Sequence, residues 1–104
     1  MTYEYKSPYG KTYELRLSKS EYVKPKNIAV LAEYFDEEFD AWLPYGNVSV
    51  NISPLPADCI ALDDNNWYGL LEWVVENGIA TDTGKVLFSG FCTYPVVRLN
   101  EGVF

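Results

Sequence analysis

Apolar and polar residues alternate near the N-terminus, as expected of β-strands with one buried face. Tyr3 and Tyr5 alternate with charged residues, and the same pattern recurs over Tyr13–Leu17. Between them, Ser7–Gly10 places Pro and Gly at the second and fourth positions of a β-turn. The pattern predicts an N-terminal β-hairpin.

Further strands are predicted in the first half of the chain, separated by polar or Pro/Gly-containing segments. We interpret Lys19–Lys26 as a loop, Asp36–Glu38 as a charged turn and Pro44–Gly46 as a second turn. The strands themselves are predicted at Ile28–Phe35, Phe39–Leu43 and Val48–Ile52. Pro54 and Pro56 end this run, because Pro cannot donate a hydrogen bond to a neighbouring strand.

Only one segment shows the periodicity of an amphipathic helix, and we predict a helix over about residues 65–77. Asp63–Asn66 supplies N-cap candidates, and Asn77-Gly78 predicts the helix end, with Ile79 packing back on the last turn. The preceding segment, Ala57–Leu62, is predicted to be extended or irregular. The apolar face consists of Trp67, Leu70, Leu71, Val74 and Val75, with Trp73 at its edge.

Two strands are predicted near the C-terminus, at Val86–Phe91 and Thr93–Leu99, after a turn at Thr81–Gly84. Gly90 indicates a bulge or bend between them, and Pro95 indicates an edge position or a strand start.

The order of these elements predicts the fold class. Strands joined by short turns imply antiparallel pairing, and an amphipathic helix must bury its apolar face against a sheet. We therefore predict a single α+β domain over residues 1–104, with an antiparallel sheet of about five to six strands and one helix packed on one face.

The residue content excludes several kinds of catalytic site. The chain has no histidine, which excludes a Ser-His-Asp triad, a Cys-His pair and any zinc site that uses histidine. It also lacks the Gly-rich motifs that bind phosphates. We expect Cys59 and Cys92 to be buried, reduced thiols, with a disulfide as the alternative. The prediction is a protein without catalytic residues, metal or cofactor, and a small enzyme is the less favoured alternative.

Charge is unevenly distributed along the chain, whose formal net charge is −7. Residues 1–26 are net basic, whereas residues 27–82 contain eleven carboxylates and no Lys or Arg. Such an acidic block repels nucleic-acid phosphates and attracts basic protein surfaces. We therefore expect no direct binding to nucleic acid and a basic protein as the partner. The alternative is that the carboxylates only keep an aromatic-rich protein soluble.

The acidic block divides into a turn, a helix start and an outer helix face. A divalent cation could bind either group of carboxylates, but helix capping accounts more simply for Asp63 and Asp64, and the acidic turn lacks the ligand spacing and the Gly of a calcium loop. The acidic turn has no such explanation, and exposed aromatic residues beside it would suit an Arg-rich partner. The candidate partner-binding residues are Asp36, Glu37, Glu38, Asp40, Trp42, Tyr45, Glu72 and Glu76.

The N-terminal segment indicates the cellular compartment. It is polar and has no apolar core of a signal peptide, and no apolar run reaches the length of a membrane span. We expect a cytoplasmic protein with no membrane contact.

Several short motifs are similar to an uncharacterised bacterial family, domain of unknown function 4313. They are Glu76–Ile79 at the helix end, Thr83-Gly84, and the run Ser89–Pro95. The strands at Tyr13–Leu17 and Asn47–Ile52 extend the similarity over most of the chain. The resemblance implies a short acidic protein of gut bacteria and their mobile elements, and it brings no catalytic residues.

This resemblance narrows the predicted function. Small acidic proteins of mobile elements are often antagonists of host defence, of the anti-CRISPR or antirestriction type. We expect an inhibitor-like protein whose acidic face binds a basic, nucleic-acid-handling host protein. The alternative is an accessory or regulatory protein of a mobile element with an unrelated protein partner.

Overall fold

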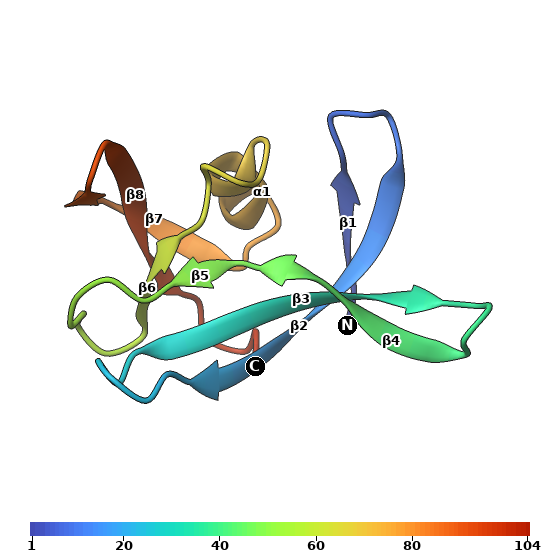
Figure 1. Ribbon diagram of the computed structural model, residues 1–104, viewed down its shortest axis with the longest axis horizontal. Helices are drawn as coiled ribbons and strands as arrows, with labels where there is room; N and C mark the ends of the chain where they lie inside the picture. Colours follow the sequence, from blue (N-terminus) through green and yellow to red (C-terminus); the bar gives the residue numbers. More distant parts are fainter.

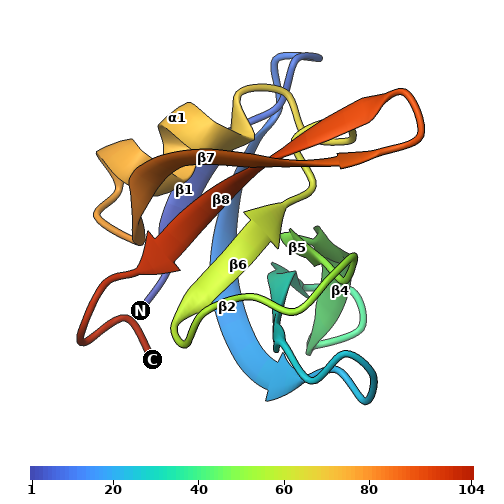
Figure 2. The same ribbon diagram turned by 90° about the vertical axis from the view of Figure 1, so that its left-hand side faces the viewer.

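The computed structural model describes residues 1–104 as two antiparallel, four-stranded sheets and one short helix (Figures 1 and 2). The first sheet has the strand order β1-β2-β3-β4 and the second the order β5-β6-β8-β7. The α+β class is confirmed, and the strand count of eight exceeds the prediction. The elements are β1 (Tyr3–Lys6), β2 (Thr12–Glu21), β3 (Ile28–Asp36), β4 (Ala41–Asn47), β5 (Ser49–Val50), β6 (Cys59–Leu62), α1 (Leu70–Glu76), β7 (Ala80–Ser89) and β8 (Cys92–Leu99).

The predicted N-terminal hairpin is confirmed, but the loop that follows it is shorter than expected. β1 pairs with β2 from Tyr3 opposite Leu15 onward. The loop prediction for Lys19–Lys26 is wrong at its start, because β2 continues to Glu21, which pairs with Ile28. Backbone pairing with β3 holds this polar end of β2 in the sheet although its side chains are exposed.

The predicted turn at Pro44–Gly46 is also wrong, because these residues lie within β4. The register between β3 and β4 shifts by one residue at Ala32/Glu33, so that Tyr45 is the extra residue of a β-bulge. Pro44 is tolerated because β4 is an edge strand. The turn that precedes β4 extends to Asp40, whose φ is +52°, and the strand therefore begins at Ala41 rather than Phe39.

The segments before and after Pro54 and Pro56 both differ from the prediction. Of the predicted strand Val48–Ile52, only Ser49–Val50 pairs, with Leu62 and Ala61 of β6. β6 itself, predicted to be extended or irregular, is a central strand of the second sheet with all four side chains buried. Its lack of alternation reflects burial on both faces.

The helix is shorter than predicted and begins differently. It starts at Leu70, after Gly69 in a left-handed conformation (φ +67°), and no side chain caps it. The N-cap prediction for Asp63–Asn66 is wrong: Asp63 instead accepts hydrogen bonds from the Asn66 side chain at 2.9 and 3.1 Å within a turn. The Asp63-Asp64 charge therefore has no capping role, because the helix begins too far along the chain.

The helix end is confirmed, and its buried face is rotated from the predicted one. Gly78 has a φ of +69°, and the Ile79 N–H donates to the Val74 carbonyl at 2.9 Å, as in a Schellman motif. Trp73, predicted at the edge of the apolar face, is only 7% exposed, whereas Val75 is 43% exposed. The Trp73 indole N–H donates to the Glu4 carbonyl of β1 at 2.7 Å, which fixes this orientation.

β7 and β8 form a hairpin that projects from the rest of the second sheet (Figure 2). The predicted turn at Thr81–Gly84 is instead a register irregularity between Asp82 and Lys85 inside β7. Gly90 (φ +61°) and Phe91 form the two-residue turn that joins the strands. Pro95 lies in an interior strand and not at the sheet edge, because the pairing of β8 with β6 stops at Val96 and needs no N–H from Pro95.

An aromatic cluster joins the first sheet to the helix. Trp67 packs against Tyr5, Tyr45 and Trp73, with ring centroids 5.2, 5.1 and 6.1 Å away. Its indole N–H donates to the Asn47 carbonyl at 2.9 Å. Gly46 permits this approach, because a Cβ at that position would lie 3.3 Å from the Trp67 ring. A few large rings therefore fill much of the space between the first sheet and the helix.

Candidate functional site

The candidate site is a groove at the point where two hairpins of the first sheet diverge. β2 pairs with β1 over Thr12–Leu15 and with β3 only from Leu15 onward. The β1–β2 hairpin therefore turns away from the β3–β4 hairpin, as the two views of the ribbon show (Figures 1 and 2). A groove of about 500 Å³ remains between Lys11–Glu14 on one side and Tyr34–Glu37 with Trp42 on the other.

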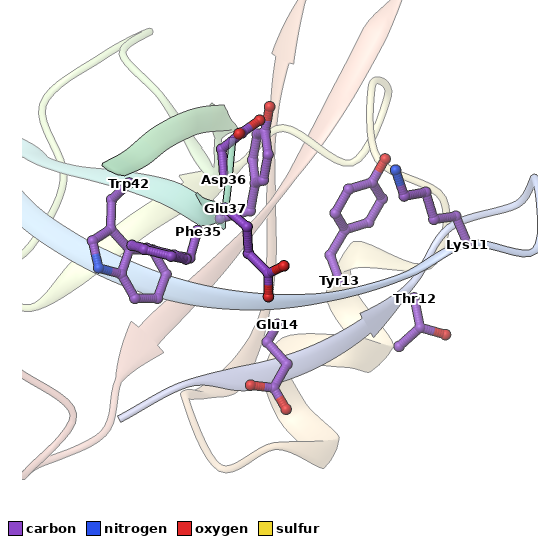
Figure 3. Close-up of a pocket in the computed structure, with 9 residues that line it drawn as sticks. Lys11, Thr12, Tyr13, Glu14, Phe35, Asp36, Glu37 and Trp42 are labelled. Carbon is purple, nitrogen blue, oxygen red and sulfur yellow. The ribbon is translucent and has the colours of Figure 1, made fainter. Parts of the chain in front are cut away.

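The groove combines aromatic rings with carboxylates. Figure 3 shows Tyr13 and Lys11 on one side, Phe35 and Trp42 on the other, and the Glu37 side chain between them. Glu14 also lines the groove, but its side chain points away from Tyr13, on the other side of β2. None of its three carboxylates, those of Glu14, Asp36 and Glu37, forms an ion pair within the protein. The Lys11 ammonium lies 5.0 Å from the Tyr13 ring centroid, in a cation–π contact.

The acidic turn lies at an exposed hairpin tip, as predicted, but one of its carboxylates has a local structural role. The Asp36 carboxylate accepts a hydrogen bond from the Phe39 N–H at 3.0 Å and so stabilises the turn. Glu37, Glu38 and Asp40 are exposed, and their side chains form no hydrogen bond. Glu37 lines the groove, whereas Glu38 and Asp40 lie at the tip beyond it.

Trp42 is half-buried and already stacks against a cation of the same chain. The Arg16 guanidinium lies 4.3 Å from the centroid of the Trp42 ring, and its Nε donates to the Glu33 carboxylate at 3.1 Å. Phe35 packs edge-on against Trp42 with the ring centroids 5.6 Å apart. These contacts hold the indole in place at the wall of the groove.

Tyr45 points into the aromatic cluster rather than toward the groove. Its ring packs against Tyr13 at 4.7 Å and Trp67 at 5.1 Å between centroids. Burial raises the pKa of the Tyr45 hydroxyl, and the nearby Tyr5 and Tyr13 raise that pKa further. Core packing therefore accounts for Tyr45 without a partner.

Glu72 and Glu76 lie on α1, which is separated from the β3–β4 tip in both views of the ribbon (Figures 1 and 2). The eight candidate residues therefore do not form one continuous surface. Asp64 lies near this second acidic region: burial raises the pKa of its carboxyl, a backbone hydrogen bond opposes the rise, and the charges of Glu72 and Asp63 add to it.

We expect Asp64→Asn to stabilise the protein at neutral pH. Because the folded-state pKa of Asp64 is raised, the charged form disfavours folding, and this penalty is present above the folded-state pKa. The gain in the thermal unfolding midpoint should disappear below about pH 4, where Asp64 is protonated in both states. Glu101→Gln, which removes a charge from an exposed turn, is the control, and an equal or larger gain from it would contradict the assignment.

The structure shows no cluster of side chains suited to metal binding, and it shows no disulfide. No group of three or more His, Cys, Asp or Glu side chains is placed to hold a metal ion. Both cysteines are free, Cys59 buried and Cys92 half-buried, so they form no disulfide with each other. The structure also has no helix with the length and apolar character needed to cross a membrane.

Sequence reasoning missed the β2 side of the groove. The alternation pattern assigns Lys11, Tyr13 and Glu14 only to the N-terminal hairpin, because it does not indicate where two hairpins diverge. The available signal is compositional: Tyr13 lies between Thr12 and Glu14 and close to Lys11, in a hairpin whose turn contains Pro, Tyr and Gly.

The fold and the groove together define a small α+β protein with an acidic, aromatic-walled groove at a fork between two hairpins. The chain belongs to the family described as Domain of unknown function (DUF4313), whose model matches residues 16–102. No curated protein and no solved structure matches this chain.

Proposed function

We propose that this is a non-catalytic binding protein that receives a basic segment of a protein partner in the groove between the β1–β2 and β3–β4 hairpins. The observation that carries the proposal is the groove's set of carboxylates without an ion pair, those of Glu14, Asp36 and Glu37, beside partly exposed aromatic rings. Of the fifteen acidic side chains of the protein, only that of Glu33 forms an ion pair. The carboxylates are therefore available to a cationic partner.

Aromatic walls and carboxylates suit an Arg or Lys side chain in particular. Guanidinium groups stack on aromatic faces and pair with carboxylates, and the protein's own Arg16 does both at Trp42 and Glu33. Lys11 on Tyr13 repeats the cation–π contact on the opposite wall. Both internal contacts support a partner that presents similar cations.

The partner class that best fits this chemistry is a basic, nucleic-acid-binding protein, and we propose a host defence nuclease of the CRISPR or restriction type. A protein surface that binds phosphates is rich in Lys and Arg, and a carboxylate surface competes for it. The proposed setting is the bacterial cytoplasm, where such nucleases act. Binding at this surface would inhibit the nuclease by excluding its DNA or RNA.

The test is to incubate the purified protein with CRISPR effector and restriction nucleases and to measure DNA binding and cleavage. We expect inhibition of at least one nuclease at micromolar concentration, and weaker inhibition as ionic strength rises, because salt screens exposed charges. Absence of binding to every nuclease, or binding that salt leaves unchanged, would contradict the proposal. Capture of ribosomal, replication or conjugation proteins instead would favour an accessory role in a mobile element.

A further inference from the structure

Three of the four sheet edges are protected against pairing with another strand. On β1, the outward carbonyl of Glu4 accepts the Trp73 indole N–H, and on β4 the carbonyl of Asn47 accepts the Trp67 indole N–H. β4 also carries Pro44 and a bulge, and β5 is only two residues long. These are the devices by which proteins prevent edge-to-edge association.

The fourth edge, β7, has no such protection over Lys85–Ser89. β7 has ten residues, and its irregularity ends at Lys85. No loop or side chain hydrogen-bonds to the backbone of Val86 or Phe88. Their side chains are 46% and 73% exposed, and Phe91 at the adjoining turn is fully exposed. The free end of the β7–β8 hairpin, which projects from the sheet in Figure 2, therefore combines an open backbone edge with the exposed apolar side chains of Val86, Phe88 and Phe91.

The register of the hairpin shows which backbone groups face this open edge. Ser89 and Cys92 close the two-residue turn and form a hydrogen-bonded pair, so alternation makes Phe88–Thr93 and Val86–Pro95 non-hydrogen-bonded pairs. The Thr93 carbonyl agrees with this assignment of hydrogen-bonded and non-hydrogen-bonded pairs. It points away from β7 and accepts a hydrogen bond from the Asn65 side-chain amide at 3.1 Å. The N–H and C=O groups of Val86 and Phe88 therefore point to the open edge.

We propose that the β7 edge pairs with β7 of a second copy of this chain, around a two-fold axis that passes beside Leu87. In this antiparallel register Val86 lies opposite Phe88 of the second copy, and both residues have their backbone groups directed across the axis. The four exposed side chains, two from each copy, then form one apolar stripe. The two second sheets join into one continuous sheet.

The charge distribution permits a second copy at this edge and disfavours a basic partner. Thr83–Asn100 contains Lys85 and Arg98 but no carboxylate in a protein of net charge −7, so the carboxylates that dominate the net charge lie outside the paired hairpins. Lys85 lies opposite Ser89 in the proposed register, so no like charges face each other. The paired segments are short and bury less than about 1,200 Å², which implies a weak, concentration-dependent dimer.

The first test measures the molar mass of the protein by light scattering across micromolar to millimolar concentration. We expect a monomer–dimer equilibrium, and Phe88→Lys should weaken it by about tenfold or more, because each substitution acts twice in a two-fold interface and adds like charge. Phe39→Lys, at the tip of the other exposed hairpin, is the matched control and should leave dimerisation unchanged. A monomer at every concentration would overturn the proposal, as would equal effects of the two substitutions.

The second test examines the register. Val86→Pro removes an N–H that faces the open edge and leaves the pairing with β8 intact, so it should abolish the dimer without loss of far-ultraviolet circular dichroism.

In a Cys92→Ser background, Leu87→Cys should form a disulfide-linked dimer on oxidation, because directly opposite residues of a non-hydrogen-bonded pair lie about 4.5 Å apart. Ser89→Cys should not, since its counterpart across the axis is Lys85. Equal crosslinking at both positions would overturn the register.

Discussion

We expect Trp67→Ala to lower the free energy of unfolding by about 3–5 kcal/mol, as large aromatic-to-alanine substitutions in cores do. Trp67 is 6% exposed and contacts Tyr5, Tyr45 and Trp73. Its removal leaves a cavity between the first sheet and the helix, and it also deprives the Asn47 carbonyl of its donor. Since domains of this kind are stable by about 5–15 kcal/mol, the variant should be close to unfolding at physiological temperature.

Urea denaturation followed by far-ultraviolet circular dichroism measures this loss without relying on tryptophan fluorescence. Trp42→Ala is the matched control: Trp42 lies at the wall of the groove, half-buried against Arg16 and Phe35, and its removal should cost about 1 kcal/mol or less. Comparable losses in the two variants would show that the aromatic cluster does not join the sheet to the helix as described.

The second large effect is expected on binding. Reversing two charges, Glu37→Lys with Glu38→Lys, should weaken association with the basic partner by about a hundredfold, because like charges then face each other across the interface. Both side chains are exposed and form no hydrogen bond, so the fold should be unaffected. Asp36 is left in place because its carboxylate stabilises the turn. The dissociation constant can be measured by calorimetry or by competition in a nuclease assay.

The control for this variant is Glu72→Lys with Glu76→Lys, which changes the net charge by the same amount on the exposed side of α1. If the groove is the binding site, the helix variant should bind nearly as well as the wild type at physiological salt. If the helix variant loses the affinity and the hairpin variant keeps it, the binding site is the outer face of the helix. Equal losses would indicate that only the overall negative charge matters.

The sequence predicts those elements whose structure depends on local patterns. The N-terminal hairpin follows from strict alternation, and the helix end at Gly78 follows from the need for a left-handed residue. The predicted helix start is wrong: Asp63–Asn66 resembles an N-cap, but the buried Trp67 and the left-handed Gly69 place the first helical residue at Leu70. In this case tertiary packing outweighs the local capping preference.

The site was predictable only in part, for a similar reason. The exposed acidic tip at Asp36–Asp40 follows from its sequence alone. Its neighbours across the groove depend on the point where β2 stops pairing with β3, which is set by the packing of Tyr13 and Tyr45 inside the aromatic cluster. Tyr45 is predicted as a partner-binding residue because its sequence position does not reveal the bulge, which alters the alternation of β4 and turns Tyr45 inward.

The different surroundings of the three tryptophans give the protein a built-in optical reporter. Trp67 and Trp73 are buried, with their indole N–H groups bonded to carbonyls of strand edges, so a quencher in solution should reach them poorly. Trp42 stands at the wall of the groove with its ring against a guanidinium. Emission that is accessible to acrylamide should therefore come mainly from Trp42, and shielding of that component would signal an occupied groove without any label.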